Sequence, residues 1–66
     1  MTNFDKLSEH DKELISRIRK LDDYGYIKWP EISHLADQLE DSSWREYWND
    51  VCKHYNHMEE ASIRAL

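Results

Sequence analysis

The spacing of apolar residues predicts three amphipathic helices, and the first of them is the most clearly marked. Leu14, Ile15, Ile18 and Leu21 fall on one face of a 3.6-residue repeat. Before them, Ser8-Glu9-His10-Asp11 sets a hydroxyl three residues ahead of a carboxylate, a variant of the capping box. We therefore expect Ser8 to cap this helix and Leu7 to pack back onto its apolar face. The helix should end around Asp22, because Asp22-Asp23-Tyr24-Gly25 joins turn-forming carboxylates to the only glycine.

The second predicted helix follows a short linker from Gly25 to Trp29 and covers roughly Pro30 to Glu40. A proline suits the first turn of a helix, where its missing N–H costs no hydrogen bond. The apolar residues behind it, Ile32, Leu35, Ala36 and Leu39, follow the i, i+3, i+4, i+7 pattern of one helix face.

The third predicted helix begins at Trp44, because Ser43-Trp44-Arg45-Glu46 reads as a full capping box. Its apolar positions keep the same spacing for three turns, and beyond Met58 the pattern weakens. The prediction is an all-α three-helix bundle over residues 7–58, with an N-terminal tail at 1–6 and a helix end or tail at 59–66. The expected core is Leu14, Ile18, Leu21, Trp29, Ile32, Leu35, Leu39, Trp44, Trp48, Val51 and Tyr55.

Composition agrees with one small helical domain. The chain has 66 residues, of which 39% are apolar and 35% charged, and its one Gly and one Pro disfavour a fold that needs repeated hairpin turns. No apolar stretch approaches the roughly 20 residues of a membrane-spanning helix. The single cysteine, Cys52, cannot close an intramolecular disulfide. These features predict an intracellular protein with no membrane contact, acting as a monomer.

Two side-chain groupings could carry chemistry, and neither is persuasive. His54 and His57 lie one helical turn apart near Cys52, a spacing that can converge on zinc. However, Cys52 falls on the apolar face while both histidines point away from it, and there is no second ligand pair. A lone cysteine without a glycine-rich loop also gives no basis for nucleophilic catalysis. We expect no enzyme activity, no metal and no cofactor, and the role of the histidines stays open.

The aromatic residues belong to segments that resemble a known protein family. The string Asp23-Tyr24-Gly25-Tyr26-Ile27-Lys28-Trp29-Pro30-Glu31-Ile32-Ser33 resembles the middle of Myb/SANT repeats. The segment from Ser43 to Tyr55 is similar to the third helix in the Myb domain of telomeric repressor-activator proteins. The resemblance covers about residues 7–55, although Leu7 replaces the first tryptophan of the pattern. It implies a trihelical domain of a telomere- or chromatin-associated protein in the nucleus.

The distribution of charge along the chain favours protein binding over DNA binding, the two functions considered for a domain of that family. The chain has a formal net charge of -5, all of it in residues 30–66, whereas residues 1–29 balance. An acidic third helix opposes approach to phosphates, which supply most non-specific DNA affinity. We therefore expect a protein-binding module, with weak duplex binding as the alternative. If DNA is bound, the contacts would be Arg17, Arg19, Lys20, Arg45 and Lys53.

The surface expected to dock a protein partner is the acidic side of the second helix. Glu31, Asp37, Glu40 and Asp41 lie there with no Lys or Arg between Pro30 and Ser43, so a basic partner would be attracted. The last two carboxylates crowd the C-terminal end of the predicted helix, which is unfavourable for its dipole.

A second resemblance belongs to a different class of protein. Pro30 and Ile32, followed by Arg45 and aromatic residues, look like the helical core of the theta subunit of bacterial DNA polymerase III and its phage relatives. This match is sparser. It implies a small accessory subunit of a replication complex, located in the cytoplasm.

Overall fold

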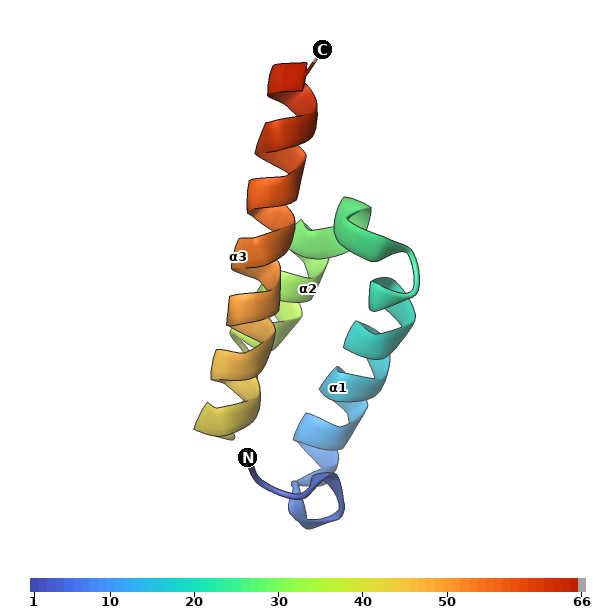
Figure 1. Ribbon diagram of the computed structural model, residues 1–66. Helices are drawn as coiled ribbons and strands as arrows, with labels where there is room; N and C mark the ends of the chain where they lie inside the picture. The colour runs from blue at the N-terminus through green and yellow to red at the C-terminus, as the bar shows by residue number, and fades with distance from the viewer. Residues whose placement is uncertain (66) are drawn as a thin grey trace.

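The computed structural model describes the backbone of residues 1–65 and the side chains of residues 1–63. These residues fold into three α-helices and two short 3-10 helices, with no strand in the described part (Figure 1). The elements in chain order are η1 (Phe4–Lys6), α1 (Glu9–Asp22), η2 (Gly25–Lys28), α2 (Trp29–Ala36) and α3 (Ser42–Ala65). The predicted all-α three-helix bundle is confirmed.

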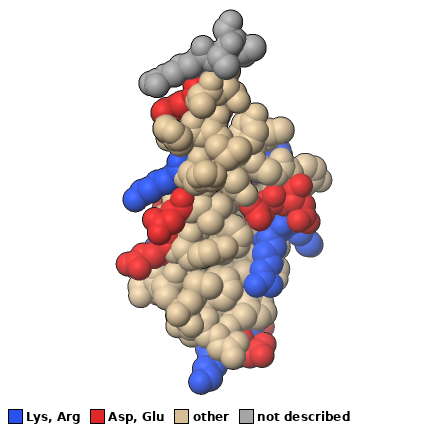
Figure 2. Space-filling model, viewed as in Figure 1, with Lys and Arg blue, Asp and Glu red and all other residues tan. Residues whose placement is uncertain are grey.

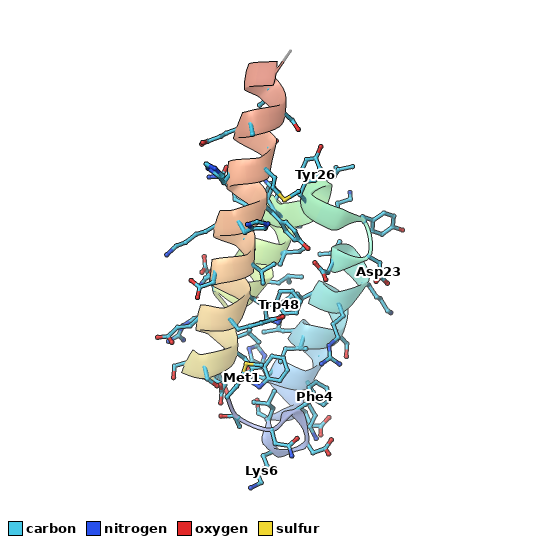
Figure 3. All side chains as sticks on the ribbon, viewed as in Figure 1. Met1, Phe4, Lys6, Asp23, Tyr26 and Trp48 are labelled. Carbon is cyan, nitrogen blue, oxygen red and sulfur yellow. The ribbon has the colours of Figure 1, made fainter. Side chains whose placement is uncertain are left out.

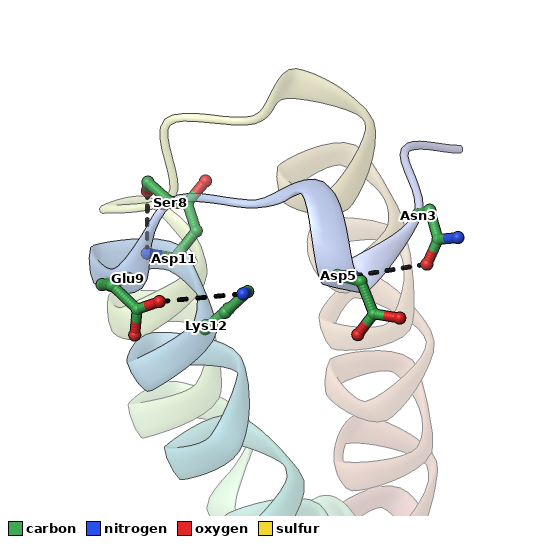
Figure 4. Close-up of polar contacts among 6 residues, drawn as sticks. All are labelled: Asn3, Asp5, Ser8, Glu9, Asp11 and Lys12. Carbon is green, nitrogen blue, oxygen red and sulfur yellow. Dashed lines mark hydrogen bonds and ion pairs between the residues drawn. The ribbon is translucent and has the colours of Figure 1, made fainter.

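Helix α1 has the bounds that the sequence predicts, but the capping box is only half formed, because the Asp11 carboxylate bonds to the backbone of Glu40 and Asp41 and not to that of Ser8. The Ser8 hydroxyl caps its N-terminus by accepting a hydrogen bond from the backbone N–H of Asp11 at 3.2 Å (Figure 4). Leu7 is buried and belongs to the core, as its position before the cap suggested. After Asp22 the chain turns through Gly25, whose φ of +73° lies in the left-handed region. A side chain there would meet no atom within 4 Å, so the backbone conformation alone favours glycine.

The linker and α2 differ from the prediction in length. The linker is itself a turn of 3-10 helix, and Pro30 lies in the first turn of α2 as expected. However, α2 ends at Ala36, not near Glu40. The N–H groups of Gln38 and Leu39 bond to the carbonyls of Leu35 and Ala36 in a tighter turn, which carries the Leu39 side chain into the core.

Helix α3 begins two residues earlier than predicted, and its cap is a different residue. The Asp41 carboxylate accepts a hydrogen bond from the N–H of Trp44 at 3.0 Å, and the Asp41 carbonyl accepts the first helical bond from Arg45. Ser43 therefore lies inside the helix, and the predicted capping box of Ser43 and Glu46 is wrong. Residues 59–65 continue α3, so they are a helix end; residue 66 of that predicted segment lies outside the described residues.

A buried carboxylate joins α1 to the connection between α2 and α3. Asp11 is only 2% exposed, and its two oxygens accept hydrogen bonds from the backbone N–H groups of Glu40 at 3.0 Å and Asp41 at 2.9 Å. Backbone donors in a reversing loop would otherwise be unpaired. Asp11 thus holds the loop that ends α2 and starts α3 against the first turn of α1.

The core lies between the three helices and contains six of the eleven predicted core residues in fully buried positions. The buried apolar residues are Leu7, Leu14, Ile15, Ile18, Ile32, Ala36, Leu39, Trp44, Trp48 and Cys52. Of the predicted core residues, Leu21, Trp29, Leu35, Val51 and Tyr55 are only partly buried and pack against it. In Figure 3 the Trp48 ring extends from α3 into the space between α3 and α1.

The segment at 1–6, predicted as a tail, packs against the start of α3. The Thr2 carbonyl accepts a hydrogen bond from the Trp44 indole N–H at 2.7 Å, and the Phe4 ring meets the Trp44 ring edge-on with centroids 6.2 Å apart. The Arg19 guanidinium lies 5.1 Å from the Phe4 ring centroid. At the other end, the last turns of α3 project beyond the bundle (Figure 1) and make the molecule elongated, with extents of 44 × 18 × 16 Å.

Replacing Asp11 by Asn tests the buried carboxylate. The amide has one oxygen, so one of the two loop N–H groups would face an NH₂ group in place of an acceptor. We expect the free energy of unfolding to fall by about 2–3 kcal/mol, the cost of an unpaired buried donor and a lost charged hydrogen bond. Urea denaturation followed by far-ultraviolet circular dichroism measures it.

The matched control is Glu13→Gln, on the exposed side of the same helix, where Glu13 pairs only with Arg17 at 2.8 Å. An exposed i,i+4 pair contributes about 0.3–0.5 kcal/mol, so this variant should unfold almost like the parent. Equal losses in the two variants would show that the loop does not depend on Asp11.

Candidate functional site

The cations predicted to contact DNA are largely held by the protein's own groups. Arg17 pairs with Glu13 at 2.8 Å, and Arg45 donates a hydrogen bond to the Leu39 carbonyl at 3.0 Å. Arg19 lies over the rings of Phe4 and Trp44. Lys20 and Lys53 are exposed, one on α1 and the other on α3. On the face shown in Figure 2, basic side chains appear in several places, and the largest basic area, at the right, borders acidic side chains.

The four acidic residues predicted to dock a partner do not all belong to the second helix. Glu31 lies in the first turn of α2, where its carboxylate is 3.7 Å from the Lys28 ammonium, and Asp37 is exposed at the end of that helix. Glu40 and Asp41 lie in the loop beyond α2, because the helix ends at Ala36. The prediction that Glu40 and Asp41 belong to the second helix is wrong, and the docking role of the four residues stays a prediction.

Asp41 has a structural role that the sequence reading assigned to Ser43. The Ser43 hydroxyl donates to the Asp41 carboxylate at 2.5 Å, and the Trp44 N–H donates to the same oxygen. These hydrogen bonds, the first from Ser43, lower the pKa of Asp41 to about 2. The charge therefore lies at the N-terminus of α3, where the helix dipole favours it, and not misplaced at the C-terminus of α2.

The structure does not assemble the zinc ligands considered from the sequence. Cys52 is 3% exposed and packs in the core, with its sulfur 3.7 Å from the Trp29 carbonyl oxygen, while His54 and His57 are exposed. No cluster of three or more His, Cys, Asp or Glu side chains suited to a metal occurs among the described residues. Burial, with a smaller effect of Asp37 and Asp22, raises the pKa of the Cys52 thiol to about 11.

The most developed surface feature is a groove between α2 and α3, with a volume of about 310 Å³. Its walls come from two turns of each helix, and its lining combines one indole with hydroxyl, carboxylate, carboxamide and ammonium groups. The lining residues are Trp29, Ser33 and Asp37 from the α2 side, and Asn49, Cys52, Lys53 and Asn56 from α3. We call this feature the α2–α3 groove.

Trp29 closes one end of this groove. It is the only one of the three tryptophans that is partly exposed, and its indole N–H donates to the Glu59 carboxylate on α3. This bond fixes the start of α2 against the projecting part of α3. At the same junction the Tyr55 hydroxyl donates to the Asp22 carboxylate at 2.7 Å, which joins α3 to the end of α1.

The sequence reading missed the two asparagines of the groove. Asn49 and Asn56 are partly buried, and no hydrogen bond from the described residues satisfies either side-chain amide. Their spacing of seven residues places them on one face of a helix, next to Cys52, which the apolar pattern had placed toward the core. This seven-residue spacing is the sequence feature from which the two asparagines could have been predicted to share one helix face.

Large apolar side chains are exposed elsewhere. Tyr24 directly precedes η2, and Ile27 lies within it. Tyr47, Met58 and Ile63 lie on α3. A second, shallow hollow of about 340 Å³ lies on α2, lined by Pro30, Glu31, His34 and Leu35. Within the described residues, none of the helices has both the length and the apolar content needed to cross a membrane.

Comparison with known proteins gives no relative: the chain matches no family model, no curated protein and no solved structure.

The hydrogen bond between Tyr55 and Asp22 predicts an alkaline loss of stability. This bond, with a smaller effect of burial, raises the pKa of Tyr55 from 10 to about 12. The stabilising contribution is complete below pH 10, where both folded and unfolded chains keep the phenol proton. It is lost as pH rises through 12, because the unfolded chain releases that proton first.

Urea titrations at a series of pH values should show this loss in the parent and a smaller one in Tyr55→Phe. A residual decrease between pH 9 and 11 is expected from Cys52, whose pKa is raised in the same direction. Tyr24→Phe, which removes a 67% exposed tyrosine hydroxyl, is the control and should follow the parent. A Tyr55→Phe curve identical to the parent's would contradict the assignment.

Proposed function

We propose that this chain is a non-catalytic helical module that acts by binding another protein. The observation that carries the proposal is the use of the three arginines predicted to contact DNA: Arg45 donates to the Leu39 carbonyl, Arg19 lies over the Phe4 ring, and Arg17 forms an exposed ion pair with Glu13. A duplex-binding surface needs cations that are free to neutralise phosphates. The net negative charge of residues 30–66 also favours protein binding over DNA binding.

The surface offers a protein partner both apolar and polar contacts. Tyr24, Ile27 and Ile63 are each more than 60% exposed, which is a large apolar display for so small a domain. The α2–α3 groove adds polar side chains that are not satisfied within the described residues. A combination of apolar anchors and unpaired polar groups is typical of protein-binding surfaces.

Weak duplex binding is the alternative to be excluded by measurement. Fluorescence anisotropy with random-sequence and telomere-like duplexes, at low and moderate salt, should give dissociation constants weaker than the usual non-specific range of about 10⁻⁴ to 10⁻⁶ M. The matched variant is Lys20→Ala combined with Lys53→Ala, which removes the two exposed cations of the predicted set that make no ion pair or hydrogen bond with the described residues. Micromolar binding that weakens steeply with salt and is lost in this variant would overturn the proposal.

Two settings are consistent with a protein-binding module. A telomere or chromatin protein in the nucleus follows from the resemblance to Myb/SANT repeats, and an accessory subunit of a bacterial or phage replicative polymerase follows from the resemblance to theta. Pro30, Ile32 and Arg45 belong to both resemblances: Pro30 lies in the first turn of α2, Ile32 is fully buried, and Arg45 holds the Leu39 carbonyl. The second setting is favoured because two aromatic residues of the Myb-like string lie outside the fully buried core. Tyr24, within the Myb-like string, is exposed, and Trp29 is only partly buried.

Photo-cross-linking from the exposed position 27 in a lysate of the source cells distinguishes the settings. We expect a polymerase-associated exonuclease among the captured proteins. A photoreactive group at position 16, an exposed residue of α1, is the positional control for non-specific capture. Recovery of chromatin or telomere proteins would favour the Myb/SANT setting, and equal, non-specific capture from both positions would contradict the proposed function.

A further inference from the structure

We propose that the α2–α3 groove binds an extended segment of a polypeptide, and that Asn49 and Asn56 recognise its backbone. The inference rests on the proposed function, because it assigns a site to the protein partner. Its starting point is that both carboxamides lie partly buried in the groove wall, without a hydrogen-bond partner among the described residues. Each carboxamide offers both a donor and an acceptor, which is the pairing that a peptide group presents.

The spacing of the two asparagines matches an extended chain. Seven residues of an α-helix rise about 10.5 Å at 1.5 Å per residue. Three residues of an extended chain span about 10 Å at 3.3–3.4 Å per residue. One extended segment lying along α3 can therefore present a peptide group to Asn49 and another to Asn56. A helical ligand could not, since its backbone groups are bonded within the helix.

The other side chains of the groove define what the segment should carry. Cys52, which is 3% exposed, lines the groove between the asparagines and offers the segment an apolar contact. Lys53 lies between the asparagines along α3, where its ammonium can donate to a peptide carbonyl. On the α2 side, Asp37 is exposed at the end opposite Trp29, so a basic side chain of the segment would be favoured at that end.

The experiment uses the full chain labelled with ¹⁵N and a library of tetrapeptides, acetylated and amidated at their ends, with Lys fixed at one position and small residues elsewhere. We expect the tetrapeptides to shift the side-chain amide signals of Asn49 and Asn56 and the indole signal of Trp29. Methylating the peptide backbone nitrogens should weaken binding about tenfold, because each methyl group removes a donor.

The test variant is Asn49→Ala combined with Asn56→Ala, which should weaken tetrapeptide binding about tenfold or more while leaving the melting temperature close to the parent's. His54→Ala, on an exposed position of the same helix, is the matched control and should bind as the parent does. Unchanged binding by the double variant would overturn the proposal. So would tetrapeptides that shift no groove signal, or a monosaccharide that shifts these signals when the tetrapeptides do not.

The same variant separates this inference from the proposed function. If the double variant captures the cross-linked partner as well as the parent does, the chain binds a protein through another surface and the groove assignment is wrong. If the parent chain captures no specific partner, the proposed function fails, whatever the tetrapeptides do.

Discussion

The arrangement of the three helices depends on one buried carboxylate. Asp11 belongs to the first turn of α1, yet both of its oxygens are used by backbone N–H groups that lie 29 and 30 residues further along the chain. A charged acceptor at 2% exposure is costly unless it is fully paired, and the loop supplies that pairing. The two Asp11 oxygens are the acceptors for two loop N–H groups, which have no acceptor within a helix. The end of α2, the start of α3 and the position of α1 are therefore fixed together.

This dependence explains which parts of the fold could be read from the sequence. Helix α1 is specified locally, by the Ser8 cap, the apolar stripe and Gly25, so its bounds were predicted correctly. The end of α2 has no such local signal, since Leu39 continues the helical spacing of Ile32 and Leu35. The chain leaves the helix because Glu40 and Asp41 bond to Asp11, and a contact over so long a sequence separation is invisible to periodicity. The displaced cap of α3 has the same origin.

The candidate site also combines features that periodicity predicts with features that only the folded chain shows. Periodicity placed Trp44 and Trp48 in the core and Cys52 on the apolar side of α3, and all three are buried. It could not show that Arg45 turns back to the Leu39 carbonyl, or that Arg19 lies over two aromatic rings, because both depend on neighbours brought close only by the fold. Counting charges suggested five phosphate contacts, whereas in the folded chain three of these cations contact groups of the same chain. The count of charges thus could not show which cations are already engaged.

The acidic residues have separate structural roles, which the idea of a single negative surface does not describe. Asp41 caps α3, Glu59 holds the Trp29 indole, and Asp22 accepts the Tyr55 hydroxyl. Each of these bonds joins α3 to another part of the chain or stabilises its start, so these three carboxylates are part of the scaffold. Asp37 differs, because it is exposed at the mouth of the α2–α3 groove. Charge at Asp22, Asp41 and Glu59 therefore helps to position the longest helix, and under our proposal it is the polar lining of the groove, more than the net charge, that selects a partner.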